Sequence, residues 1–202
     1  MRERAQQIAL DAHTEPAGEV FVFDCASDFR FTVQLDSSRA WLYLPSDTVM
    51  LRQSVSASGA RYENEQYLFW SKGGSAMLKT GEESFTDCAL NHSESIWQAA
   101  ALRGAHFRAV GNEPGWHLEL EYGEQLLLVT NYGEESYSFL TPDIQKPADY
   151  PVSYDLQAGE NRLQIVIRNE QCIDNMSGKE FPFSAEVVIN DQTLRGCGRA
   201  LP

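Results

Sequence analysis

The sequence predicts an all-β protein: two small antiparallel β-barrel or β-sandwich domains joined by a short helical linker. Apolar and polar residues alternate with a period of two along much of the chain. Turn residues separate these runs at intervals of roughly 8–12 residues, which is typical of small barrels and sandwiches. With 202 residues, of which 43% are hydrophobic, the chain is large enough to bury a core in each half.

The first half contains a series of short predicted strands. Alternation is clearest over 29–35, where Phe29, Phe31, Val33 and Leu35 are interleaved with polar residues. Further strand-like runs cover 40–44, 49–53, 67–70 and 76–79, and turn residues such as Pro45-Ser-Asp lie between them. We assign 1–18 to an N-terminal tail, either a short helix or disordered chain, and 19–91 to the first β-barrel.

Residues 92–105 have a helical composition instead. Ser93 or Ser95 is placed to cap a helix, the run Ala-Ala-Ala-Leu-Arg has high helix propensity, and Gly104 is a stop signal. We therefore predict that 92–105 is the linker and that 106–202 is a second β-domain.

In the second half, strands are expected to resume after Gly115. The runs 116–122 and 126–131 form a predicted hairpin, and further strands are expected at 163–167 and 183–189. The segment Asn112-Glu-Pro-Gly-Trp116 is either a ligand-contacting loop or, as we favour, a turn whose tryptophan packs in the core.

Four cysteines fall two and two between the halves, at Cys25, Cys88, Cys172 and Cys197. Because they form no CxxC pair and the four histidines are scattered, no metal site is expected. Of the three connectivities, we choose Cys25–Cys88 and Cys172–Cys197, which close loops of about 63 and 25 residues and add roughly 3–4 kcal/mol each. Disulfides imply an oxidising compartment, and the alternative is four reduced thiols in a cytosolic protein.

The formal net charge is −13, so a nucleic-acid partner is not expected. This acidity either attracts a basic partner or simply keeps the protein soluble. The sequence has no run of the ~20 apolar residues that a membrane helix needs. Its polar start lacks the apolar core of a signal peptide, so export would imply a leader already removed, together with any lipid-anchor cysteine.

The sequence contains no GxSxG, HExxH or SxxK pattern and no phosphate-binding glycine loop, so neither a catalytic residue nor a cofactor is expected. Ser58 and Lys72 would have the chemistry of a nucleophile and its base, but no oxyanion hole is evident beside them. The segment around Ser58 is instead a small, glycine-containing loop. If the intervening strands form a hairpin, Ser58 and Lys72 emerge side by side, whereas the plain alternative is an ordinary turn and a solvated lysine.

Three segments carry a resemblance to a known family: Ser56-Ala-Ser-Gly-Ala-Arg-Tyr62, Phe69-Trp-Ser-Lys72-Gly73 and Ala76-Met-Leu78. They resemble the bacterial membrane-bound and periplasmic inhibitors of c-type lysozyme, which carry an SGxxY motif and a following Lys-Gly motif. The resemblance covers about residues 20–90 and implies a small antiparallel barrel closed by Cys25–Cys88.

The same resemblance implies that Ser58 and Lys72 enter the cleft of a c-type lysozyme and bind its catalytic carboxylates. Gly59 would permit the turn and Tyr62 would support the loop. Ser56, Arg61 and Gly73 complete the predicted partner-binding set. Lysozymes of this class are basic, so the net negative charge of this protein would attract them and speed association. The implied location is periplasmic or associated with the outer membrane.

Two alternatives stay open at this point. The first is a cell-envelope module that binds peptidoglycan or another glycan-processing enzyme. The second is an enzyme in the second half, where 107–116, 172–178 and 196–199 resemble a domain of bacterial envelope proteins with no role that we can assign. In that half the second disulfide would bring Asp174 near Arg199, and we favour a structural ion pair there.

Overall fold

The computed structural model describes residues 18–26, 28–81 and 83–202. The chain divides into a first unit that ends at Arg103 and a second unit, Gly104–Pro202. Both units are built of antiparallel strands, which confirms the predicted all-β class. The predicted N-terminal tail lies outside the described residues except for Gly18.

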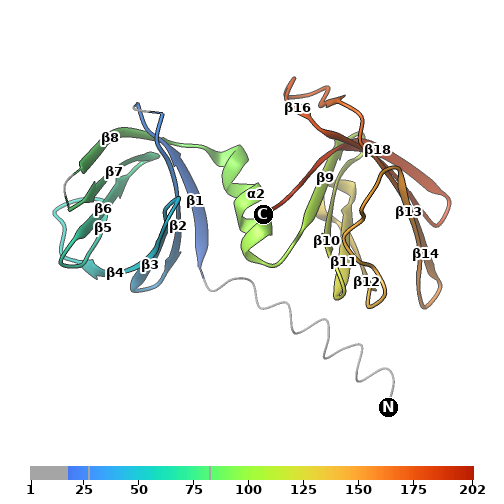
Figure 1. The fold of residues 1–202 in the computed structure, drawn as a ribbon, viewed down its shortest axis with the longest axis horizontal. Coiled ribbons are helices and arrows are strands. Elements are labelled where there is room, and N and C mark those ends of the chain that lie inside the picture. The colour runs from blue at the N-terminus through green and yellow to red at the C-terminus, as the bar shows by residue number, and fades with distance from the viewer. Residues whose placement is uncertain (1–17, 27, 82) are drawn as a thin grey trace, which may run out of the picture. The chain divides into compact units, whose positions relative to one another are not determined.

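The first unit is a closed barrel in which consecutive strands are neighbours (Figure 1). Its strands are β1 (Glu19–Asp24), β2 (Arg30–Asp36), β3 (Arg39–Tyr43), β4 (Thr48–Ser54), β5 (Ala60–Glu63), β6 (Tyr67–Lys72), β7 (Ser75–Thr80) and β8 (Glu83–Leu90). The barrel closes where β1 pairs with β8, with Phe23 opposite Leu90. Side chains of alternate residues point inward, as the period of two in the sequence predicts.

Aromatic rings fill this barrel. Phe23 stacks on Phe31 with ring centroids 5.5 Å apart, and Phe69 meets the edge of Phe31 at 6.1 Å. Such offset and edge-on pairs add to the free energy gained by burying the rings. The disulfide Cys25–Cys88 joins the start of the barrel to its last strand, as predicted.

Helix α2 (His92–Leu102) follows β8 and packs against β1. Its N-cap is Asn91, whose side chain accepts a hydrogen bond from the Glu94 amide at 3.0 Å, so the expected cap at Ser93 or Ser95 is wrong. Ser95 lies inside the helix, where its buried hydroxyl accepts a hydrogen bond from the Val22 amide of β1 at 2.8 Å. The structure therefore uses this serine to attach the helix to the barrel.

The second unit contains an antiparallel sheet in the order β12-β11-β10-β9-β18-β17-β14-β13. Its strands are β9 (Phe107–Asn112), β10 (Gly115–Glu121), β11 (Gln125–Thr130), β12 (Glu135–Leu140), β13 (Val152–Ala158), β14 (Asn161–Arg168), β17 (Phe183–Ile189) and β18 (Gln192–Ala200). A short 3₁₀ turn, η1 (Asn131–Gly133), separates β11 from β12. Inward-facing side chains of these strands build a second core, separate from that of the barrel.

Strand β9 corrects the expectation that strands resume only after Gly115. Its alternating pattern is short, because the outward-facing Arg108, which forms a buried ion pair with Glu119 of β10, is followed on the same face by the apolar Val110. An apolar residue on the outer face interrupts the alternation that marks a strand in a sequence. The favoured interpretation of the next segment is confirmed, because Asn112 and Gly115 pair across a turn and Trp116 is only 4% exposed.

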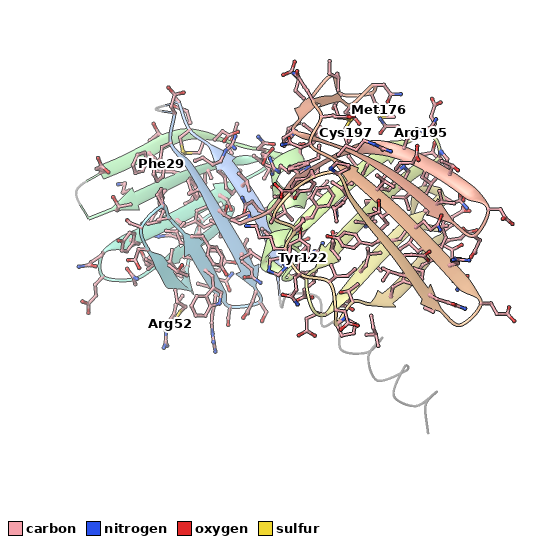
Figure 2. The ribbon with its side chains drawn as sticks, turned by 45° about the vertical axis from the view of Figure 1, so that its right-hand side comes forward. Phe29, Arg52, Tyr122, Met176, Arg195 and Cys197 are labelled. Carbon is pink, nitrogen blue, oxygen red and sulfur yellow. A yellow bond between two sulfur atoms is a disulfide. The ribbon has the colours of Figure 1, made fainter. Side chains whose placement is uncertain are left out.

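A small projecting segment, which we call the flap, comprises residues Cys172–Phe181. It contains the two-stranded sheet of β15 (Cys172–Ile173) and β16 (Glu180–Phe181). The predicted disulfide Cys172–Cys197 attaches the flap to β18. Figure 2 shows Cys197 and Arg195 of β18 together with Met176 of the flap at this end of the sheet.

Candidate functional site

The hairpin β5–β6 brings the two predicted contact residues together. Ala60 pairs with Ser71, so the loop before β5 and the turn after β6 lie at the same end of the barrel. There the Lys72 Nζ donates to the Ser58 Oγ over 3.4 Å, a long and weak hydrogen bond. Both side chains are exposed. The hairpin geometry expected from the sequence is therefore present.

Gly59 is required by the close approach of these two segments. Its φ is +72°, and a Cβ at this position would lie 2.3 Å from the carbonyl oxygen of Ser71. Any other residue would meet backbone atoms and a left-handed conformation that it disfavours. Gly73 and Gly74 also have positive φ, and they form the tight turn that carries the chain from Lys72 to its partner Ser75.

The loop is held by hydrogen bonds to one carbonyl oxygen. The Ser58 oxygen accepts from the Trp70 Nε1 at 3.0 Å and from the Ser56 Oγ at 2.6 Å. The hydroxyl of Ser58 is thereby left to face solvent and Lys72. Trp70 supports the loop but is not in the predicted partner-binding set, although it belongs to the motif segment Phe69–Gly73. Its position two residues before Lys72 was the signal that could have identified it.

Tyr62 and Arg61 differ from Ser58 and Lys72 in their surroundings. Tyr62 is 5% exposed and its ring lies 6.2 Å from that of Phe69, so it belongs to the barrel core beneath the loop. Burial raises the pKa of its hydroxyl. Arg61 forms an ion pair with Glu63 at 2.6 Å, and the resulting hydrogen bond lowers the pKa of Glu63. Ser58 and Lys72, by contrast, are exposed at the end of the barrel.

A largely apolar cavity of about 270 Å³ opens beside Lys72 at the same end of the barrel. Gly59, Gly73 and Gly74 form part of its rim. Its apolar lining consists of Phe21, Phe23, Leu35, Phe69 and Leu90. The end of the barrel therefore offers an ammonium group, a hydroxyl group and an apolar depression on one surface.

Within residues 18–26, 28–81 and 83–202, no group of three or more His, Cys, Asp and Glu side chains is placed to hold a metal ion. In the same part of the chain, no helix combines the length and apolar character needed to cross a membrane.

Comparison with known proteins bears on the barrel. A family model described as the membrane-bound lysozyme-inhibitor of c-type lysozyme matches residues 23–85. A Yersinia enterocolitica protein named membrane-bound lysozyme inhibitor of C-type lysozyme is 33% identical over 79 residues, which are 38% of this chain and 67% of that protein. No significant match was found among solved structures. Through its first domain, the chain belongs to the family of membrane-bound lysozyme inhibitors of c-type lysozyme.

Proposed function

We propose that this protein inhibits c-type lysozyme by inserting the Ser58 loop and Lys72 into the active-site cleft of the enzyme. The observation that carries the proposal is the contact between Lys72 Nζ and Ser58 Oγ at the exposed end of a barrel that belongs to an inhibitor family. The proposal assigns the barrel a binding role and no catalytic one.

The chemistry of the target supports this pairing. Lysozymes hydrolyse glycosidic bonds with two carboxyl groups, one of which donates a proton while the other is ionised. An ammonium group can pair with the ionised carboxylate, and a serine hydroxyl can donate to one carboxyl oxygen or accept from a protonated one. Charge-assisted hydrogen bonds of this kind are about twice as strong as neutral ones. The long contact between Lys72 and Ser58 is weak enough to be exchanged for these partners.

The order already present in the loop supports tight binding. Because Trp70 and Ser56 hold the Ser58 carbonyl and Gly59 fixes the turn, little conformational entropy remains to be lost on association. The apolar cavity beside Lys72 offers a further surface that a partner can cover.

The inferred location rests on the disulfides and on the family. Two disulfides require an oxidising compartment, and the family is named for membrane-bound members. We infer a location in the bacterial envelope, periplasmic or associated with the outer membrane.

The decisive experiment is the double variant Ser58→Ala plus Lys72→Ala, assayed by the loss of turbidity of a cell-wall suspension under c-type lysozyme. We expect inhibition to fall by at least roughly a hundredfold, since two charge-assisted contacts are removed. The circular dichroism spectrum should stay unchanged, because both side chains are exposed.

A matched control lies on the neighbouring strands. Lys79 and Ser84 are an exposed lysine and serine that face each other across β7 and β8. The variant Lys79→Ala plus Ser84→Ala should therefore inhibit as the wild type does. If the folded Ser58/Lys72 double variant inhibits as strongly as the wild type, the assignment of these contact residues is overturned. If the wild-type protein does not inhibit lysozyme but is retained on peptidoglycan beads, an envelope-binding module is favoured.

A further inference from the structure

The second domain has a pocket of about 390 Å³ on the outer face of its sheet. Its floor crosses four neighbouring strands. Arg168 of β14 is paired with Ser184 of β17, Ser184 with Cys197 of β18, and Cys197 with Val110 of β9. These four residues form one row across the sheet and all line the pocket.

The flap forms the wall of this pocket, and several bonds hold it there. The disulfide Cys172–Cys197 attaches one end of it to the floor. The Asn112 Nδ2 of β9 donates to the Asp174 Oδ2 at 2.9 Å and to the Asn175 Oδ1 at 2.6 Å. Asp174 is only 7% exposed, and its other carboxyl oxygen accepts from the amide and hydroxyl of Ser177, both at 2.7 Å. The pocket is therefore built in advance of any ligand.

One of the two cations that line the pocket, Arg168, has no hydrogen-bonded partner in the described part of the chain, although, beside the hydrogen bond from Arg195, its charge helps to lower the pKa of the neighbouring Glu186. Glu186 of β17 is paired with Arg195 of β18 at 2.8 Å. Asp174 is saturated by its four donors, one of which is the Met176 amide. Arg168 is half-buried in the floor, and within the described part of the chain its guanidinium makes no hydrogen bond or close ion pair. A half-buried guanidinium has given up part of its hydration, so a ligand that accepts its hydrogen bonds would be favoured.

We propose that this pocket binds a small ligand through a carboxylate group received by Arg168, and that the free C-terminus of a peptide is the form that fits best. The planar guanidinium matches a carboxylate with two parallel hydrogen bonds. The amide oxygen of Asn112 and the carboxylate of Glu186 lie in the same pocket and can accept N–H groups of a peptide. Ile173 of the flap, which is 61% exposed, offers an apolar contact to a side chain.

The charge balance argues against a phosphate as the ligand. Three carboxylates, Glu113, Asp174 and Glu186, line the pocket, and they would repel a dianion more strongly than a monoanion. A single guanidinium without a hydrogen-bonded partner also neutralises one charge and not two. The volume lies near the lower end of the range for ligand sites, which suits two or three residues of a peptide.

The test is a titration of the isotope-labelled full chain, followed by NMR, with trialanine, its C-terminal amide, acetate and inorganic phosphate. We expect trialanine to shift the amide signals of Gly111, Asn175 and Gly196. The C-terminal amide should bind at least roughly tenfold more weakly, because it lacks the charge that Arg168 receives. If acetate binds as well as trialanine does, the ligand is a simple carboxylate and not a peptide end.

Two variants on one strand complete the test. Arg168→Gln should weaken binding of trialanine by about the same factor as amidation does. Arg162→Gln is the matched control, because Arg162 also lies on the outer face of β14 but pairs with Asp155 away from the pocket. The proposal is overturned if none of the carboxylates binds, if phosphate binds more tightly than trialanine, or if Arg168→Gln binds as the wild type does.

Discussion

At the scale of single residues, two glycines at one end of the barrel have unequal tasks. Gly59 and Gly73 both have positive φ, of +72° and +56°. A Cβ on Gly59 would collide with the Ser71 carbonyl, whereas a Cβ on Gly73 would meet no atom within 4 Å. The first glycine thus lets two chain segments approach each other, and the second only permits a turn.

This difference predicts unequal effects of one substitution. Gly73→Ala should lower the free energy of unfolding by about 1 kcal/mol, the cost of a left-handed alanine. Gly59→Ala should lower it by on the order of 3 kcal/mol, because the strand must also move, and it should weaken inhibition of c-type lysozyme. Urea unfolding followed by tryptophan fluorescence measures both, and equal losses would show that the contact between the loop and β6 does not constrain Gly59.

At the scale of elements, the stability of the flap depends on one carboxylate, that of Asp174. Burial raises the pKa of Asp174, but the hydrogen bonds from Ser177, Asn112 and Met176 lower it by more, and its pKa in the folded protein lies below its ordinary value. A lowered pKa means that the ionised carboxylate stabilises the flap above about pH 4, the range of an unfolded aspartate. This contribution is lost as the pH falls through the pKa of the folded state.

We therefore expect the flap to loosen in acid before the sheet does. Hydrogen exchange measured between pH 7 and pH 2.5, and corrected for the intrinsic pH dependence of exchange, should show protection of the Ser177 and Gly178 amides falling as Asp174 is protonated. In Asp174→Asn this step should vanish, and protection should be low throughout. A flap whose protection is independent of pH in the wild type would contradict the role of this carboxylate.

Some of these elements could be predicted from the sequence and others could not. The barrel strands were predictable because β2 and β3 alternate cleanly between core and solvent. Strand β9 was hidden because its outward-facing Val110 is apolar, and the N-cap at Asn91 was hidden by the two serines that follow it. In the second case a contact between segments distant in the sequence overrode the local pattern, because Ser95 is bound to the Val22 amide of β1.

The candidate site was also predictable from the sequence only in part. The sequence motifs predicted Ser58 and Lys72 as contact residues, and the hairpin that brings them together could be anticipated from the strand lengths between them. The hydrogen bond from Trp70 to the loop could not, because a tryptophan in a strand is more often a core residue. The flap and its pocket were also beyond reach, because four strands and the loop at Asn112 have to come together before that pocket exists.

At the scale of the whole molecule, each unit has a hydrophobic core of its own. This separation predicts that the fragment 1–103, which retains the barrel, helix α2 and the disulfide Cys25–Cys88, inhibits c-type lysozyme as strongly as the full chain does. A turbidity assay at equal concentrations, with circular dichroism to verify folding, provides the measurement. A folded fragment with clearly weaker inhibition would show that the second unit contributes to binding.

Closure of the first barrel has a last consequence. Because β1 pairs with β8 through Phe23–Leu90 and Asp24–Ala89, the described strands leave no free edge at the end of the barrel that carries Lys72, where a partner could otherwise add a strand. Contacts at this end are therefore made by side chains at the ends of strands, and those positions contribute little to the aromatic interior. Residues 55–58 and the turn at Gly73 can therefore be changed while Gly59 and the barrel strands are kept, which makes this domain a scaffold for displaying short binding loops.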